Sequence, residues 1–187
     1  WESKITGEMQ VEARDAIQPE IENIRAAIQW GVADGNQQTV HTALQVLSDF
    51  YFMRGYYAGV ESFKNFAKFF QDQCHSGVDA EKPGSLMLLT ALTYQAYFLS
   101  MLGAVEEAEE IARKILPELR DLNIPQELRV CLMSLGINAS FRGDYQKAEQ
   151  DFKEGLEIAE NSQHLLGIVG AKIWWGWAYY EQGANEE

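Results

Sequence analysis

The sequence predicts an all-α protein, an α-solenoid of antiparallel helix pairs that wind into a right-handed superhelix. Three observations carry this prediction. Proline is scarce, while the helix-forming residues Ala, Leu, Glu and Gln are abundant. Apolar residues recur at i, i+3, i+4 and i+7, the spacing of one helix face. Glycines recur at a fixed interval between such stretches, since Gly103, Gly143 and Gly183 lie 40 residues apart. A fixed interval of this size is typical of repeat proteins.

The helix boundaries follow from local signals along the chain. Pro19 suits the first turn of a helix, and Pro125 follows a segment in which another helix stops. Gly143 is expected to end a helix in a conformation that favours glycine, and Asp144 can cap the next one. The helices are predicted at 19–33, 37–54, 56–73, 85–102, 104–121, 126–142, 144–161 and 165–182.

The predicted helices group into repeat units. Gly55 has the same place in its unit as Gly103, 48 residues later, and the eight extra residues fall in the loop-like segment 73–84. In the last unit a second helix would begin at Ala184. We therefore expect the aromatic helix 165–182 to be left uncovered and to form a homodimer through its apolar surface. The repeat units are 37–73, 85–121, 126–161 and a truncated 165–187.

The start of the sequence predicts a neighbouring domain. The first residue is Trp1 and no basic and apolar leader follows it, so the sequence is interpreted as a piece of a longer protein. Residues 1–18 are less periodic than the rest and are predicted to be a linker from a preceding domain. Residues 19–187 are predicted to form one helical-repeat domain, a length that suits a single core.

Charge and cysteine content restrict the partners and the compartment. Lys and Arg number 15 against 28 Asp and Glu, which gives a formal net charge of −13 at pH 7. Such a charge repels phosphate backbones, so direct nucleic-acid binding is not expected. Cys74 and Cys131 form no CxxC pair and no disulfide framework, which suits the reducing cytoplasm. The uncharged stretch 83–105 contains Ser, Thr and Gln, so we expect a buried helix and not a membrane span.

The sequence resembles two known families. The run Leu-x-x-Leu-Gly-x-x-Ala…Gly-Asp-Tyr-x-x-Ala-x-x-x-Phe-x-x-Gly-Leu, residues 132–156, resembles a tetratricopeptide (TPR) unit, and Trp175-Gly176-x-x-Tyr179…Gly183 resembles its first half. This resemblance covers about residues 37–187. The 40-residue spacing exceeds the usual ~34 and is similar to longer-looped variants of signalling proteins.

The second resemblance concerns about residues 15–75. The segments EIENIRAAIQWGVADGN and FMRGYYAGVESFKNFAKF resemble the start of the helical-repeat region of bacterial STAND-class signalling ATPases and transcription regulators. In that family such a region follows a nucleotide-binding module and a winged-helix module. Neither resemblance brings a catalytic residue into this chain.

A concave groove is the predicted binding site. In a solenoid the first helix of each pair lines the concave side, and here these helices supply aromatic residues and Met with few charges, which suits a protein or peptide, or a small effector. Chaperone-binding TPR proteins hold a carboxylate with Lys, Arg and Asn; these faces supply no Lys or Arg, so that function is not expected. The same residues could instead pack as core between repeats, and both interpretations stay open. The predicted groove residues are Phe52, Met53, Tyr97, Met101, Met133, Ile137, Phe141, Trp177 and Tyr180.

No enzyme signature is present. The sequence contains no GxxxxGK[ST] loop and no GxGxxG turn. His41, His75 and His164 form no zinc motif, and Asp72 and Cys74 beside His75 lack a fourth metal ligand. We therefore expect no catalytic residue, no metal and no cofactor.

The function predicted from sequence is a non-catalytic interaction or effector-sensing module of a larger bacterial signalling or transcription-regulating protein. A ligand in the groove would favour one curvature of the solenoid and so act on the upstream domains. One alternative is a structural or oligomerisation scaffold whose groove is closed by packing. A remote alternative is an enzyme on a helical-repeat frame.

Overall fold

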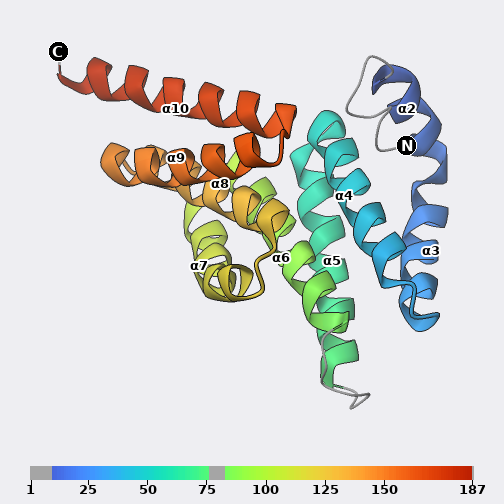
Figure 1. Cartoon of the computed structure of the whole chain (residues 1–187). Coiled ribbons are helices and arrows are strands. Elements are labelled where there is room, and N and C mark those ends of the chain that lie inside the picture. Colours follow the sequence, from blue (N-terminus) through green and yellow to red (C-terminus); the bar gives the residue numbers. More distant parts are fainter. Residues whose placement is uncertain (1–9, 76–82, 187) are drawn as a thin grey trace. The chain divides into compact units, whose positions relative to one another are not determined.

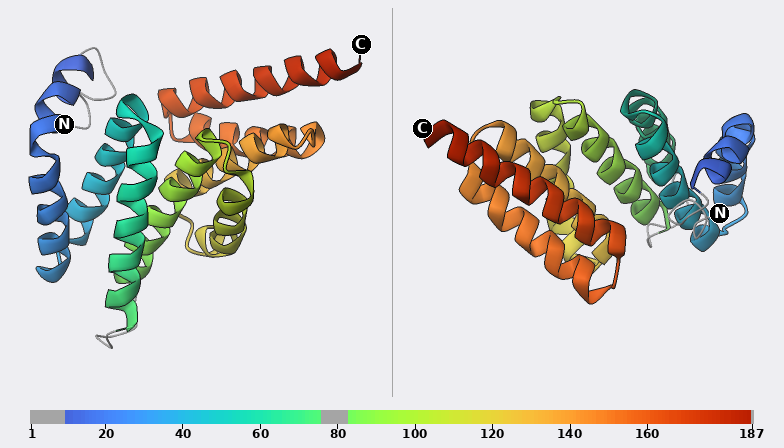
Figure 2. Two further views of the ribbon diagram at one scale, coloured as in Figure 1. Left: turned by 180° about the vertical axis from the view of Figure 1, so that it is seen from behind. Right: turned by 90° about the horizontal axis from the view of Figure 1, so that it is seen from above.

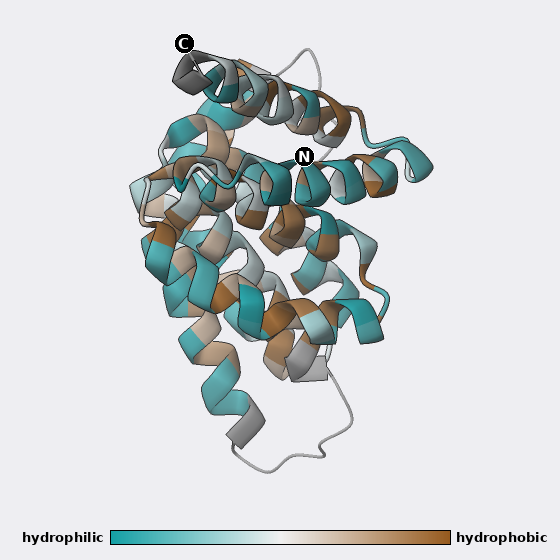
Figure 3. Cartoon of the chain, turned by 90° about the vertical axis from the view of Figure 1, so that its left-hand side faces the viewer, coloured by the Kyte–Doolittle hydropathy of each residue, from teal (hydrophilic) through white to brown (hydrophobic). Residues whose placement is uncertain are grey.

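The computed structural model describes residues 10–75 and 83–186, and these residues form helices and short turns with no strand among them. The predicted all-α class is therefore confirmed. The chain divides into two compact units, residues 1–91 and residues 92–187, and each is described by itself. Hydrophobic and hydrophilic residues are mixed along the helices (Figure 3).

The first unit is built from consecutive helices that pack on one another, with α3 on α4 and α4 on α5 (Figure 1). Its interior is rich in aromatic rings, and the Phe63 ring contacts the rings of Tyr51 and Phe66 at centroid distances of 6.3 and 6.1 Å. Its described elements are α2 (Gln10–Ile17), η1 (Gln18–Glu20), α3 (Ile21–Ala33), α4 (Gln37–Arg54), α5 (Tyr56–His75) and the first part of α6 (Pro83–Met101).

The predicted linker 1–18 differs from the structure. Residues 1–9 lie outside the described part, but α2 occupies residues 10–17 and contacts α4. Ala13 and Ile17 of α2 are fully buried. Two apolar residues four positions apart are enough to attach one short helix, although they are too few to produce a visible period over residues 1–18. The segment 10–17 is therefore part of the folded unit.

The second unit follows the predicted helix map closely. After the end of α6 come α7 (Val105–Asp121), α8 (Pro125–Phe141), α9 (Tyr145–Asn161) and α10 (Leu165–Glu186). Each of these helices packs on the next one in the chain, and α10 also touches α8. Figure 2 shows α8, α9 and α10 from two further sides.

The turns of the second unit repeat every 20 residues. Each contains one residue in the left-handed region: Gly103 and Gly143 have φ of +76°, Asn123 has +51° and Gln163 has +54°. Each turn also makes the same pair of backbone hydrogen bonds; the N–H of Gly143 donates to the Ser140 carbonyl at 3.0 Å, and that of Asp144 to the Ala139 carbonyl at 2.9 Å. This is the Schellman pattern of helix ends.

The predicted roles of two neighbouring residues are confirmed in this way. Gly143 ends α8 in the left-handed region, and the Asp144 side chain accepts a hydrogen bond from the backbone N–H of Lys147 at 3.2 Å at the start of α9. The turns therefore recur with a 20-residue step from helix to helix, and glycine occupies every second one.

Gly183 does not take the predicted role. It lies inside α10, which runs on to Glu186, and it has no positive φ. Glycine permits the left-handed conformation without requiring it, so its 40-residue spacing alone does not end the helix. Within the described residues, no second helix begins at Ala184.

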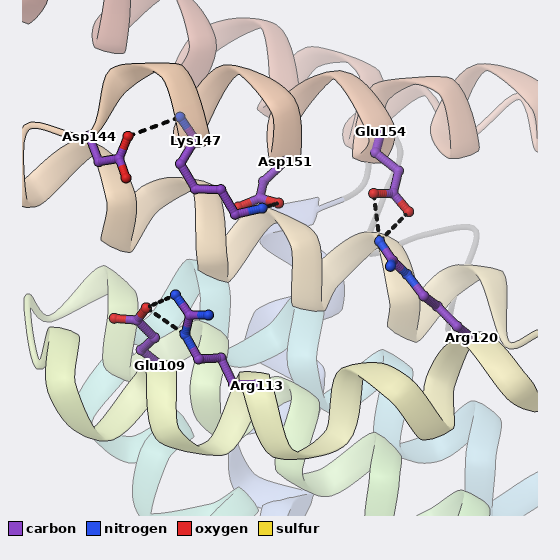
Figure 4. A network of polar contacts seen from close by, with 7 residues as sticks. All are labelled: Glu109, Arg113, Arg120, Asp144, Lys147, Asp151 and Glu154. Carbon is purple, nitrogen blue, oxygen red and sulfur yellow. Dashed lines mark hydrogen bonds and ion pairs between the residues drawn. The ribbon is translucent and has the colours of Figure 1, made fainter.

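A side-chain ion pair connects α7 and α9 (Figure 4): the Arg120 guanidinium donates to both carboxylate oxygens of Glu154, at 2.8 and 2.7 Å. Arg113 pairs with Glu109 within α7. The Arg120–Glu154 pair is partly exposed, and such pairs stabilise a fold by about 0–1 kcal/mol each. Asp151 differs because it is buried, with Oδ1 2.7 Å from Nζ of Lys147.

Candidate functional site

The predicted groove residues fall into two classes in the second unit. Met133 and Ile137 are 4 and 0 % exposed and belong to the core, together with Phe152 of α9 and Ala171 and Ala178 of α10. They do not form a binding surface, because α9 and α10 cover that side of α8. For these two residues, packing between helices is what the structure shows.

Tyr97 and Met101 are intermediate in solvent exposure. Both are half-buried and pack against the same core cluster as Met133 and Ile137. The ring of Tyr97 also contacts the Phe98 ring, with centroids 5.8 Å apart. In the first unit Met53 is half-buried, while Phe52 is exposed and its ring lies 5.9 Å from that of Tyr56.

Phe141 and Trp177 come together in a cluster of three rings, which we name the aromatic cluster: Phe141, Trp174 and Trp177. The Phe141 ring lies 5.5 Å from Trp177 and 6.3 Å from Trp174, and the two indoles are 5.5 Å apart, all measured between ring centroids. All three contacts are edge-to-face, with interplanar angles, in the same order, of 66°, 75° and 84°. This geometry contributes about 0.5–1.5 kcal/mol per pair beyond burial.

The cluster joins α8 and α10, two helices that are not consecutive in the chain. Phe141 is the last residue of α8, and Trp174 and Trp177 stand three residues apart on one side of α10. Phe141 is 45 % exposed, Trp177 is half-buried, and Trp174 packs against the core cluster at its base. The arrangement is a rigid aromatic surface that remains partly open to solvent.

Sequence reasoning missed Trp174. The i, i+3 spacing to Trp177 was available as a signal, but Trp174 falls between the positions predicted for the core and those predicted for the groove. Only the approach of Phe141 from α8 shows that Trp174 completes a cluster.

A second aromatic pair holds α10 on α9. Trp175 and Tyr179 are stacked, with centroids 6.1 Å apart and an interplanar angle of 20°. The Tyr179 hydroxyl donates to Oε1 of Glu149 on α9 at 2.9 Å, and this hydrogen bond to a carboxylate raises the pKa of Tyr179. Trp175 packs against the core cluster, whereas Tyr179 is 52 % exposed and is linked to α9 by this hydrogen bond.

A row of apolar side chains runs along the outside of α10. The side chains stand at near-heptad spacing, so they share one side of the helix. Tyr180, the last of the predicted groove residues, is 72 % exposed at one end of this row. The exposed row consists of Leu166, Val169, Ile173 and Tyr180.

Two nitrogen-bearing side chains, Arg129 and His164, lie at the first turn of α10 and serve its packing. Arg129 of α8 is 8 % exposed, and its Nη1 lies 3.0 Å from where a Cβ on Gly167 would stand. Arg129 thus packs under the first turn of α10. His164 is also structural: its Nδ1 accepts a hydrogen bond from the N–H of Gly167 at 2.9 Å and so caps α10.

Among the described side chains, no group of three or more His, Cys, Asp and Glu stands close enough to hold a metal ion. The predicted loop residues Cys74 and His75 lie outside the part whose side chains are described. Cys131 is buried and its S–H points to the Ala112 carbonyl at 3.5 Å; burial, reinforced by the charge of Asp151, raises its pKa to about 12.

In the part of the chain that the structure describes, none of the helices combines the length and the apolar character that a membrane span needs.

Comparison with known proteins leaves the family unassigned: no protein-family model matches the chain, and no curated protein and no solved structure shows a significant match to it.

Proposed function

We propose that this chain is a non-catalytic, TPR-like module that binds a protein or peptide, or a small effector, through the aromatic cluster. The observation that carries the proposal is the contact of Phe141 with Trp174 and Trp177 across two repeat units. Three rings held edge to face and partly open to solvent form a preorganised apolar anchor, the kind of surface in which binding energy concentrates.

The TPR-like solenoid belongs to the same proposal. It is supported by the 20-residue step between turns of one conformation and by the packing of each helix on its neighbour in the chain. A protein with a formal net charge of −13 at pH 7 is a poor match for nucleic acid. A cytoplasmic protein or peptide with exposed apolar side chains is the partner class that fits.

The regulatory setting is proposed from the resemblance to STAND-class proteins. The aromatic cluster joins α8 to α10, so a partner that contacts the rings of both helices favours one spacing between them. Through that preference, binding would act on domains elsewhere in the parent protein.

The test uses a photo-crosslinking amino acid in the full-length protein in its own cells. One variant carries it at Trp177, and the control carries it at Trp30, an aromatic residue that is 68 % exposed in the first unit. We expect a discrete crosslinked partner from position 177 that is absent from position 30 and is weakened by Phe141→Ala. Identical products from both positions would reject the proposal. If the ligand is a small effector, Phe141→Ala should lower its affinity in a titration.

A scaffold that self-associates through α10 is the second candidate, and the exposed apolar row on that helix favours it. Light scattering on the purified protein distinguishes the two. The scaffold is favoured if the protein forms a dimer that Ile173→Asp abolishes and if no other partner binds the aromatic cluster. Detectable turnover of a substrate, abolished by one acidic substitution, would instead favour the enzyme alternative.

A further inference from the structure

Glu109, near the start of α7, receives two guanidinium groups. Its Oε1 accepts a hydrogen bond from Nε of Arg113, one turn further along α7, at 2.7 Å (Figure 4). Its Oε2 accepts a second hydrogen bond from Nη1 of Arg142, the residue that follows α8. The Glu109 side chain is only 12 % exposed. Hydrogen bonds between ionised groups are stronger than those between neutral groups, so Glu109 connects the end of α8 firmly to α7.

Glu149 has the equivalent position in α9 and holds α10. Gly103 and Gly143 stand before α7 and α9 with the same φ of +76°. Glu109 and Glu149 each follow the glycine of their turn by six residues. The Oε1 of Glu149 accepts the hydrogen bond of the Tyr179 hydroxyl at 2.9 Å. Each of the two carboxylates therefore connects its own helix to the next helix in the chain or to its end.

These two contacts lie beside the two halves of the aromatic cluster. Arg142 directly follows Phe141, and its backbone N–H donates to carbonyls in the last turn of α8. A shift of the Arg142 side chain on α7 therefore moves the end of α8 that carries Phe141. Tyr179 stands on α10, as do Trp174 and Trp177. Because an α-helix has a fixed rotation per residue, the hydrogen bond of Tyr179 also fixes the direction in which the two indoles stand.

The apolar packing of α10 leaves room for such a role. Small residues line its buried side, namely Gly167, Ala171 and Ala178. Helices lock together where the ridges formed by large side chains enter grooves on the neighbouring helix, and a row of small side chains forms only low ridges. A hydrogen bond has a preferred distance and direction, so it adds a register that this row does not supply.

We propose that Glu109 and Glu149 are positioning residues for the aromatic cluster. Glu109 places Phe141 through Arg142, and Glu149 places the two indoles through Tyr179. This inference goes beyond the proposed function, because it concerns how the rings are held and applies whatever ligand they bind.

The test uses the whole protein labelled with fluorinated tryptophan and fluorine NMR without any ligand. Replacement of one tryptophan at a time by Phe assigns the resonances. Arg142→Met removes the guanidinium and keeps the side-chain stem, and Glu109→Met removes the carboxylate. We expect each to move the Trp177 resonance by more than its linewidth, because Phe141 changes its distance from that indole. Their combination should move it no further, since both remove one contact.

Two further changes test the contact on α10. Tyr179→Phe and Glu149→Met each remove the hydrogen bond between α10 and α9, and each should move the Trp177 resonance in the same way as their combination. Glu107→Met, which removes an exposed carboxylate of α7, is the control and should leave the resonance in place. Arg142→Lys keeps the charge and should leave the resonance closer to its place in the natural protein than Arg142→Met does.

Two results would overturn the inference. Contacts that only stabilise the fold would lower the urea midpoint of unfolding when they are removed and would leave the Trp177 resonance of the folded protein in place. A resonance of Trp30, in the first unit, that moves together with that of Trp177 would show a general change of structure. Neither result depends on the crosslinking experiment, so this inference and the proposed function can fail separately.

Discussion

The ring of Phe152 lies over Gly136, and a Cβ at that glycine would stand 2.5 Å from Cε1 and 2.7 Å from Cδ1 of the ring. The ring is fully buried, so it has no space into which it can retreat. Gly136 is therefore required by the close approach of α9 to α8, and not by backbone conformation. The glycine at the equivalent position of α10, Gly176, has no such neighbour.

Two alanine substitutions at these equivalent positions should have opposite effects. Gly136→Ala should lower the free energy of unfolding by about 1–3 kcal/mol, because the added methyl overfills the core. Gly176→Ala should raise it by up to about 1 kcal/mol, because alanine favours the helix and meets no described atom. Urea unfolding followed by circular dichroism measures both. Equal effects of the two substitutions would contradict the close contact, and Phe152→Leu should restore part of the loss in Gly136→Ala.

The turns predict an order among glycine substitutions. A residue other than glycine in the left-handed region costs roughly 1–2 kcal/mol, whereas glycine loses more backbone freedom on folding, by about 0.5–1 kcal/mol. Gln163→Gly should therefore stabilise the protein slightly, and Asn123→Gly less, since Asn tolerates this region. Gly143→Ala should destabilise it by about 1 kcal/mol. Thermal melts of the three variants check the order; a destabilised Gln163→Gly would argue against the +54° φ at that position.

The buried carboxyl of Asp151 predicts a specific pH dependence. Burial raises its pKa above the ordinary value of 3.8, and the hydrogen bond from Lys147 only partly offsets this. The protonated form of the Asp151 carboxyl is therefore favoured more in the folded than in the unfolded protein. The resulting stability is fully present below pH 3.8 and is lost as the pH rises through the folded-state pKa.

Asp151→Asn cannot ionise, so its stability relative to the natural protein should rise between pH 4 and pH 7. Urea midpoints of both proteins at these two values measure the change. Glu154→Gln, which removes a partly exposed carboxylate, is the control and should alter stability by only about 0.5 kcal/mol. If the stability of Asp151→Asn relative to the natural protein instead falls as the pH rises, the ion pair with Lys147 outweighs the cost of burying the carboxylate.

The Cys131 thiol should be unreactive in the folded protein. Burial raises its pKa to about 12, so almost no thiolate is present at pH 8, and no path leads solvent to the sulfur of a residue that is 0 % exposed. With Cys74 replaced by Ser, Cys131 is the only thiol. A thiol reagent at pH 8 should label it only as fast as the protein unfolds, and addition of urea should give one equivalent at once. Rapid labelling without urea would show that the packing of α7 on α8 opens readily.

The sequence by itself determined the helices and most of their ends. Apolar spacing located α4, α5 and α7 to α9 within two residues of the observed bounds. Gly103 and Gly143 revealed two of the turns, because glycine in a fixed register is a strong local signal. The predicted helix map also left gaps at Asn123 and Gln163, but it did not show that these turns share the left-handed conformation of the glycine turns, because neither residue is a glycine.

Tertiary structure decided which apolar side chains are core and which are open. Met133 and Trp177 both stand on predicted groove positions, yet Met133 is buried by α9 and α10 while Trp177 stays half open against Phe141. Periodicity gives the side of a helix on which a residue lies, but not whether another helix covers that side. That depends on contacts between residues far apart in the chain. At Gly183, where the repeat alone predicted an end, α10 runs on, because glycine permits a helix end without requiring one.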